Sequence, residues 1–532
     1  MRRPNASLAA LLAASLLAAG CGRCGTPAPS LPAERFVPGG ATGLVLIPRL
    51  AAAAGQAAAL HATLSALPGQ YELQALRGAL SAQLSFDAFD PASMAGAGLD
   101  PARGAALAEL PGAPGEQAGR LLLVLPVGDA GKLTALLSRL ARDRLGAVER
   151  GLENANGKPI EVWRRAAGEP AQLALAVLER TALVGVGPSG PDALRTALAL
   201  DPALSLERSP AWLRNRAALA EDAAVILYLA PGSSPLSSRL PGEGLAAGLS
   251  ATARSLRLVV AAPLGALEAR LRPLAGTGAG RTGATPLDPA TLVALRVSAS
   301  PAALRGLVEG ELSGGTLPAP LLQVVSALEP PIDAGLALAP GADLGAALSS
   351  RGEIEPLRVA RAEAVARVQA GVDLAPLLED LARAAGATGA AGGPAGAERR
   401  WRLQAGRAEV AWALAGERLL LSAGPPGGLD ALLARGAVGG DAWRPPNPAA
   451  AEALSGGLGG LVLDGPGLAR AVLALPPSAF GGGPDAVVTR SLVEKVVQPG
   501  GQALTASLRA DLPAGALRLV LEVALAGPGQ AP

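Results

Sequence analysis

The chain of 532 residues has few of the side chains that most enzyme centres use. It contains one histidine, His61, and two cysteines, Cys21 and Cys24. A zinc site made of several cysteines or of two histidines is therefore excluded. A Ser-His-Asp or Cys-His site would need a nucleophile against His61, and the neighbouring sequence does not suggest one. We expect His61 to be an exposed or cap-side residue of an alanine-rich helix.

Aromatic residues make up only 2% of the chain. Sites for carbohydrate or single-stranded nucleic acid usually need aromatic platforms on which rings or bases stack, so both classes are disfavoured. The 46 basic and 44 acidic residues nearly balance. Without a basic patch there is no electrostatic footprint for nucleic acid, and we predict no nucleic-acid partner.

The first twenty residues contain the one long uncharged run that matters for location. Met1-Arg2-Arg3 is followed by an uncharged stretch, 6–20, and then by Cys21. A short basic region, about 15 apolar residues and small residues before a cleavage point are typical of a bacterial export signal. Beyond this segment no uncharged apolar run reaches 18 residues, so the sequence predicts no later transmembrane helix.

The junction Leu17-Ala-Ala-Gly-Cys21 resembles the lipobox of bacterial lipoproteins. The resemblance implies that residues 1–20 are cleaved off as a signal peptide and that Cys21 carries lipid on its sulfur and amino group. The alternative is a plain secretory signal with a chance cysteine. Cys24 then has no partner in the chain, and is either an inert thiol or one half of an intermolecular bridge. Gly22 stands where lipoproteins of enteric type have Asp for inner-membrane retention, which favours the outer membrane, facing the periplasm.

The chain after Cys21 is expected to fold as two related units. We assign residues 21–33 to a flexible tether, 34–275 to the first unit, 276–286 to a linker, 287–526 to the second unit and 527–532 to a tail. The evidence is a series of six matched elements in the same order. The pairs are Val45 with Val293, Leu136-Leu137 with Leu377-Leu378, Trp163 with Trp401, Leu183–Val186 with Leu419–Ser422, Trp212 with Trp443, and Ser255–Arg257 with Ser507–Arg509. This recurrence predicts an internal duplication, in which the paired tryptophans are core anchors.

The strands have the period expected of sheets with one buried face. Residues 516–525 alternate leucine or valine with alanine, arginine and glutamate. Such alternation favours largely antiparallel sheets packed against helices, an α+β fold, over a doubly wound parallel sheet. Asn156-Gly157 predicts a type I′ hairpin between strands at 147–152 and 159–164. A second hairpin is expected between 255–261 and 266–271, an amphipathic helix over 132–145, and a flexible loop over 386–397.

Four local patterns invite a chemical interpretation, and each has a simpler explanation. Gly185-Val-Gly-Pro-Ser-Gly190 has the spacing of a dinucleotide-binding turn but lacks the acidic residue that should follow. Gly131-Lys132 lacks the remaining residues of a phosphate loop. The acidic pairs Asp87/Asp90 and Glu379/Asp380 are explained by helix caps and solvated faces. We therefore expect no catalytic residues, no cofactor and no metal.

The order of signal, tether and duplicated α+β ectodomain resembles uncharacterised envelope lipoproteins of GC-rich bacteria. That resemblance implies a membrane-tethered protein of the cell envelope and supplies no active residues. We expect a non-enzymatic protein that binds a partner or acts as a scaffold. Two alternatives stay open: a carrier whose Ala/Leu/Val-lined cavity holds lipid or another apolar ligand, and a diverged enzyme without a recognisable motif.

Overall fold

The structure is a computed structural model that describes most of residues 33–525. Short gaps lie at 66–70, 113–118, 234–243, 392–398, 406–407, 439–441, 456 and 513–515, and longer ones at 301–318 and 340–359. Two further gaps, 265–286 and 475–503, are broken only by isolated described positions. Contacts divide the chain into two compact units after residue 267, with 513–518 grouped with the first. The expected signal peptide, linker and tail lie outside the described residues, and so does the expected tether except for Ala33, which begins the short 3-10 helix Ala33–Phe36.

The first unit begins with a short 3-10 helix and then combines ten strands with six α-helices among its described residues. In chain order they are η1 (Ala33–Phe36), β1 (Gly43–Ile47), α2 (Leu50–Ser65), α3 (Tyr71–Leu84), α4 (Pro91–Gly96), β2 (Ala105–Leu110), β3 (Arg120–Pro126), α5 (Ala130–Leu145), β4 (Glu149–Ala155), β5 (Lys158–Arg164), β6 (Leu173–Leu178), β7 (Thr181–Val186), α6 (Gly190–Leu198), α7 (Pro210–Ala217), β8 (Val225–Leu229), β9 (Leu245–Ala251) and β10 (Ser255–Pro263).

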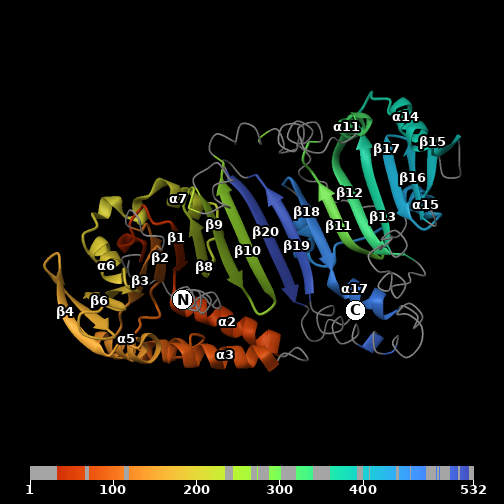
Figure 1. Cartoon of the computed structure of the whole chain (residues 1–532). Helices are drawn as coiled ribbons and strands as arrows, with labels where there is room; N and C mark the ends of the chain where they lie inside the picture. Colours follow the sequence, from red (N-terminus) through yellow and green to blue (C-terminus); the bar gives the residue numbers. More distant parts are fainter. Residues whose placement is uncertain are drawn as a thin grey trace. The chain divides into compact units, whose positions relative to one another are not determined.

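These strands form one twisted sheet in the order β10-β9-β8-β1-β2-β3-β7-β6-β5-β4 (Figure 1). Every pairing in this series is antiparallel, so the predicted α+β class with antiparallel sheets is confirmed. The Asn156-Gly157 hairpin is confirmed as well: both residues have positive φ, 53° and 77°, as a type I′ turn requires.

The second unit contains a similar series of strands and helices among its described residues. They are β11 (Thr291–Val297), α11 (Ala319–Ser326), β12 (Leu328–Leu338), β13 (Ala360–Val368), α14 (Ala375–Ala385), β14 (Thr388–Ala391), β15 (Arg399–Ala405), β16 (Ala408–Ala415), β17 (Arg418–Gly424), α15 (Gly428–Val438), α16 (Pro448–Ser455), β18 (Gly459–Asp464), α17 (Gly465–Leu473), β19 (Leu504–Asp511) and β20 (Ala516–Leu525).

The second unit repeats the strand order of the first. It runs β20-β19-β18-β11-β12-β13-β17-β16-β15-β14, in which each strand takes the place of the strand ten numbers lower in the first unit. A tandem duplication would produce this recurrence, and the duplication itself stays a prediction. One matched pair from the sequence is wrong in this frame: Ser507 lies in β19, whose counterpart is β9, whereas Ser255 opens β10.

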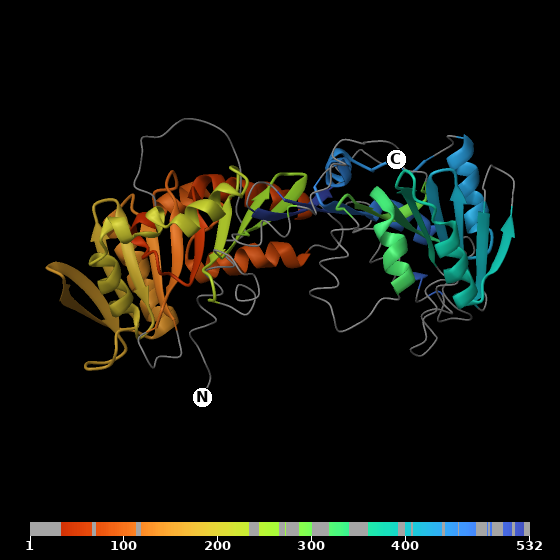
Figure 2. The ribbon, with the colours of Figure 1, turned by 90° about the horizontal axis from the view of Figure 1, so that it is seen from above.

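Helices cover both faces of the sheet where β16 lies. Trp412 and Leu414 belong to a core cluster with α14, whereas the alternate residues Ala411 and Ala413 belong to a cluster with α15. Figure 2 shows these two helices on opposite sides of the strands. Because successive side chains of a strand point to opposite faces, one strand supplies both cores.

One local expectation needs correction and another is not tested. β10 pairs antiparallel with the preceding strand β9, and these two strands form a hairpin over 245–263. The predicted hairpin between 255–261 and 266–271 stays a prediction, because 266–271 lies outside the described residues. The expected loop at 386–397 begins instead with a short strand, β14, paired with β15. The glycines and alanines that favour a loop there are tolerated in a strand whose backbone hydrogen bonds are satisfied by a neighbouring strand.

All five tryptophans are buried, between 0% and 6% exposed, which confirms the interpretation as core anchors. Trp212 lies inside α7 and packs edge-on against Tyr228, with ring centroids 5.4 Å apart. Its predicted counterpart Trp443 lies before α16 and donates from its indole nitrogen to the carbonyl of Thr291 at 2.9 Å. The two tryptophans are therefore both buried, one within a helix and the other in the segment before a helix.

The second unit contains a buried ion network. Glu363, on β13, accepts from Arg435 of α15 at 2.6 Å and lies 3.3 Å from Arg361. Both arginines also face Asp288, which precedes β11. The Glu363 side chain is 2% exposed, so its charge is tolerable only with these partners.

We predict that Arg435→Met lowers the free energy of unfolding by about 3 kcal/mol, because it leaves a buried carboxylate short of a cation. The control is Arg383→Met, which removes an exposed pair with Asp380 and should cost less than about 1 kcal/mol. Urea unfolding followed by tryptophan fluorescence measures both. Equal effects of the two substitutions would contradict a stabilising role for the buried network.

Candidate functional site

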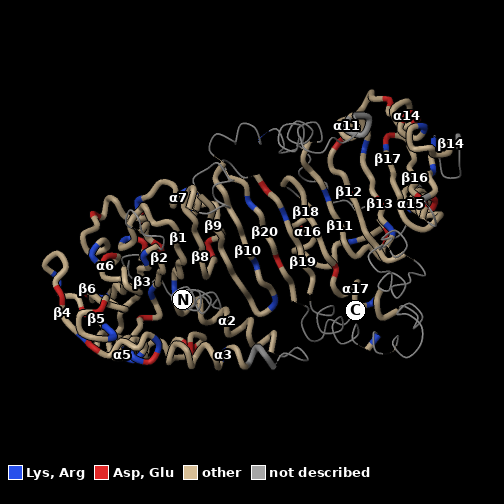
Figure 3. Tube along the Cα trace, in the orientation of Figure 1, with Lys and Arg blue, Asp and Glu red and all other residues tan. Residues whose placement is uncertain are grey.

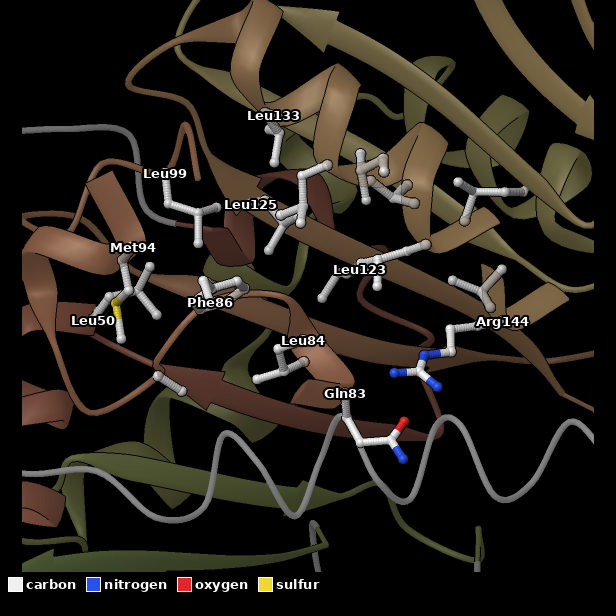
Figure 4. A pocket seen from close by; sticks show the side chains of 18 of the residues that line it. Leu50, Gln83, Leu84, Phe86, Met94, Leu99, Leu123, Leu125, Leu133 and Arg144 are labelled. Carbon is white, nitrogen blue, oxygen red and sulfur yellow. The ribbon is translucent and has the colours of Figure 1, made fainter. Parts of the chain in front are cut away.

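An apolar cavity of about 130 Å³ lies inside the first unit (Figure 4). Its wall comes from α5, from the strands β3, β6 and β7, and from the segment that joins α3 to α4. The lining side chains are Ile47, Leu50, Ala53, Gln83, Leu84, Phe86, Ala88, Met94, Leu99, Ala105, Leu123, Leu125, Leu133, Leu136, Leu137, Leu140, Ala141, Arg144, Leu145, Leu173, Val184 and Val186. All except Gln83 and Arg144 are apolar.

Helix α5 provides the largest share of this wall. Leu133, Leu136, Leu137, Leu140 and Ala141 recur at helical spacing and form one face. Asp129 caps the first turn by accepting from the backbone N–H of Lys132, and Gly146 ends the helix in the left-handed conformation. The predicted helix over 132–145 is therefore confirmed, and its leucine face is now seen to line a cavity rather than a fully packed core.

The two polar lining residues lie together at one side of the cavity. In Figure 4 the side chains of Gln83, from the end of α3, and Arg144, from the end of α5, approach the same region. Arg144 donates from Nη2 to the carbonyl oxygen of Ala82 at 2.9 Å. Its guanidinium thus connects the last turns of two helices, where carbonyl groups favour a cation. The cavity consequently has an apolar interior and one charged edge.

The second unit fills the corresponding space with an aromatic ring. In the first unit Trp163 on β5 stands opposite Leu173 on β6, and Leu173 lines the cavity. In the second unit Trp401 stands opposite Trp412 in the matching strands, and the two indoles are stacked with centroids 6.4 Å apart. Leu173 and Trp412 therefore occupy the same register position in the two units. The size of the side chain at this position helps to decide how much space remains next to the sheet.

The volume is large enough for a small apolar group. An engineered cavity of roughly 150 Å³ with a similar aliphatic lining stays dry and binds benzene. By the cavity term measured for core substitutions, about 24 cal/mol per Å³, an empty space of 130 Å³ costs about 3 kcal/mol. A fold that keeps such a space open carries a cost that ligand binding would offset.

The residues singled out from the sequence have structural roles. His61, expected to be an exposed or cap-side helix residue, is half-buried in α2. Its ring lies edge-on to Phe89 at 5.6 Å, and its Nδ1 is 3.4 Å from the hydroxyl of Ser65. Asp90 caps α4 by accepting from Ala92 and Ser93. Glu379 and Asp380 each pair with an arginine at the surface of the second unit.

Asp87 is held in a turn between α3 and α4. It accepts from Arg77 at 2.5 Å and from the backbone N–H of Phe89 at 2.9 Å. Burial by itself would raise the pKa of Asp87, but these hydrogen bonds and the charge of Arg77 outweigh it and lower the pKa below the ordinary 3.8. A carboxylate fixed in this way supports the cavity wall, because Phe86 and Ala88 flank it in the sequence and line the cavity.

The two glycine motifs also serve the fold. Gly185 is the next-to-last residue of β7 and Gly190 begins α6, and a Cβ on either would overlap the backbone of the other. The strand before this turn pairs antiparallel on both sides, unlike that of a dinucleotide-binding unit. At Gly131-Lys132 the N-terminus of α5 is occupied by the carboxylate of Asp129. An anion would meet like charge there.

Several sequence expectations fall outside what the structure describes. Cys21 and Cys24 both precede residue 33. Among the described residues, no three His, Cys, Asp or Glu side chains are grouped in a way that suits a metal ion. No helix in the described part of the chain combines the length and hydrophobicity needed to cross a bilayer.

A row of partly exposed leucines lies on one face of the sheet in the second unit. Leu508, Leu461 and Leu295 stand opposite one another on β19, β18 and β11, each about two fifths exposed. Leu463 and Leu336 continue the same face. Charged positions of both signs are interspersed along the described chain (Figure 3). The row is therefore a local apolar feature of one sheet face.

Comparison with known proteins identifies no family. No protein-family model and no curated protein matches the chain. Solved structures of TP0453 give weak matches. Crystal form III has 11% identity and a TM-score of 0.24 over 44% of this chain and 80% of TP0453, and crystal form IV has the same identity and score over 46% and 86%. A TM-score of this size does not establish a common fold, so the site must be interpreted from its own geometry.

We predict that Asp87→Asn weakens the acid-dependent part of stability. Because the folded-state pKa lies below 3.8, the charged form stabilises the protein above that pH, and this stability is lost as the pH falls through the folded-state value. Thermal unfolding between about pH 2 and 7 should show a lower midpoint at neutral pH and a shallower fall in acid. Asp143→Asn, an exposed change on α5, is the control. Identical pH profiles for Asp87→Asn and wild type would contradict this account.

Proposed function

We propose that the chain is a non-enzymatic, lipid-anchored protein of the bacterial cell envelope that binds an apolar ligand in its first α+β unit. The observation that carries the binding function is the cavity lined by α5, β3, β6 and β7, whose interior offers only hydrocarbon and one thioether to a guest. Burial of each CH₂ group there would contribute about 0.8 kcal/mol. The lipobox-like junction at Cys21 supports the anchor and the envelope location, with Gly22 favouring the outer membrane.

The chemistry of the site favours binding over turnover. The polar residues at the cavity are an amide and a guanidinium, neither of which acts as a general base near neutral pH. The carboxylate nearest in sequence, Asp87, is engaged by Arg77 and the backbone. These features support a carrier or a ligand-regulated binding protein, the apolar-ligand alternative of the sequence interpretation.

Leu173→Trp is the direct test of the cavity. The substitution places in the first unit the indole ring that the second unit has at the matching position. The ring should therefore fill the cavity without a change in the backbone of the strand. Native mass spectrometry of the gently purified full-length protein should show wild type carrying a copurified apolar molecule and Leu173→Trp without it.

Val177→Trp is the matched control for that experiment. It adds the same ring to the same strand, β6, at a position that is 38% exposed and does not line the cavity. Its ligand content should equal that of wild type. A wild-type protein that arrives free of any apolar molecule, and takes up none when one is added, would refute the proposed function.

The anchor has its own test. Cys21→Ser should leave the precursor uncleaved and without lipid, because the thiol is the site of acylation that the resemblance implies. Metabolic labelling with a radioactive fatty acid and the mobility of the protein on denaturing gels measure both effects. Two or more acyl chains give firm membrane attachment. If Cys21→Ser fractionated, migrated and incorporated label as wild type does, the lipoprotein proposal would fail.

The leucine row of the second unit favours a second candidate function, docking of an envelope protein. A photo-crosslinking residue at position 461 should then give one discrete adduct in cells, and the same residue at the exposed position 152 of the first unit should give none. Absence of an adduct from position 461, or equal labelling from both positions, would count against a partner on this face.

A further inference from the structure

The charged edge of the cavity carries information about the ligand. Gln83 and Arg144 are the two side chains with polar ends among its 22 lining residues, and they lie at the same side (Figure 4). A ligand whose apolar part fills the interior would therefore present its other end to this edge. The nature of that end follows from the charges found there.

Arg144 is a cation without a carboxylate partner in the described part of the protein. Its one hydrogen bond, from Nη2 to the carbonyl of Ala82, leaves the other donors of the guanidinium unused. A second exposed cation, Arg165, donates from Nε to the carbonyl of Leu145, the last residue of α5 and a member of the cavity wall. Two guanidinium groups thus lie at the end of the helix that lines the cavity.

We propose that the cavity takes the hydrocarbon chain of a single-chain amphiphile and that Arg144 binds its anionic headgroup at the edge. This inference rests on the proposed function and narrows it to one class of ligand. A guanidinium presents its donors in a planar fork that matches two oxygens of a carboxylate or a phosphate. The headgroup stays at the surface, so no charge has to be buried.

The size of the cavity agrees with one chain rather than two. By comparison with the benzene-binding cavity, about six carbon atoms fit inside, and a longer chain would extend through the opening toward Arg144. Away from this edge the lining is apolar, with Phe86 and Met94 beside the aliphatic side chains, so it gives no partner to a polar group deeper in the chain. A fatty acid and a single-chain lipid phosphate share the required chemistry.

The test compares four ligands that share one chain. Octanoate, octyl phosphate, octanol and octylammonium are titrated below their micellar concentrations into the full-length protein by isothermal titration calorimetry. The protein is kept in digitonin, whose rigid steroid body is too large for a benzene-sized space. The Leu173→Trp variant in the same detergent supplies the background from partition into micelles.

We expect octanoate or octyl phosphate to bind at least about fivefold more tightly than octanol, with octylammonium weakest, because a charge-assisted hydrogen bond forms only with the anions. The tighter of the two anions identifies the headgroup as carboxylate or phosphate. Arg144→Gln should lower the affinity for both anions to that for octanol, and should leave the affinity for octanol unchanged. Arg142→Gln, which removes an exposed charge from the same helix end, should change none of the four.

The outcomes separate this inference from the proposed function. If none of the four ligands binds wild type, the proposed function fails. If octanol binds as tightly as the anions, or if Arg144→Gln keeps their advantage, the ligand class is wrong while apolar binding stands. If Arg144→Gln also loses octanol binding, Arg144→Lys is measured in its place, because lysine keeps the positive charge. When Arg144→Lys still binds octanol, which shows that its cavity is intact, it must also retain the preference for the anions. Failure to retain that preference overturns the inference.

Discussion

The packing of α5 on the strands β3, β6 and β7 is the contact on which the first unit depends. One face of this helix supplies five leucines and an alanine, and they pack toward Leu123, Leu173 and Val184 of the strands. The two layers are fixed by side-chain size at a distance that leaves hydrocarbon-lined space between them. Since protein interiors are otherwise packed as densely as organic crystals, this space is the feature of the unit that most needs a functional explanation.

The two units show how one topology supports different interiors. Both have the same strand order, and a helix packs at the same place, α5 in one and α14 in the other. Where the first unit has Leu173, the second has Trp412, whose stack with Trp401 closes the interior. The second unit also buries the ion network of Glu363, which fixes β13 against α15. Because its interior is filled, the second unit would contribute to function through its surface, where the leucines of β18 and β19 are partly exposed.

Several polar groups near the cavity hold its wall in place. Arg77 and Asp87 fix the turn between α3 and α4, and Asp90 begins α4. Each hydrogen bond of this kind contributes about 1 kcal/mol, more where a charge takes part. Arg144 differs from them because it joins two helix ends, is exposed to solvent, and keeps donors that no other described residue engages. That difference separates a residue available to a ligand from residues committed to the fold.

Several features can be predicted from the amino-acid sequence alone: the α+β class, the antiparallel sheet, the hairpin at Asn156-Gly157, the amphipathic helix of α5 and the burial of the tryptophans. These features follow from local periodicity and turn chemistry, which a linear pattern records. The sequence also supplies the lipobox-like junction at Cys21. It did not reveal the cavity, because the same leucine spacing on α5 serves a filled or an unfilled core. Whether the core is filled depends on the side chain at one position of a strand that faces the helix. Leu173 on β6 leaves space, and Trp412 at the matching position of β16 fills it. The meeting of Gln83 and Arg144 is likewise a product of tertiary structure, since 61 positions separate them in the chain.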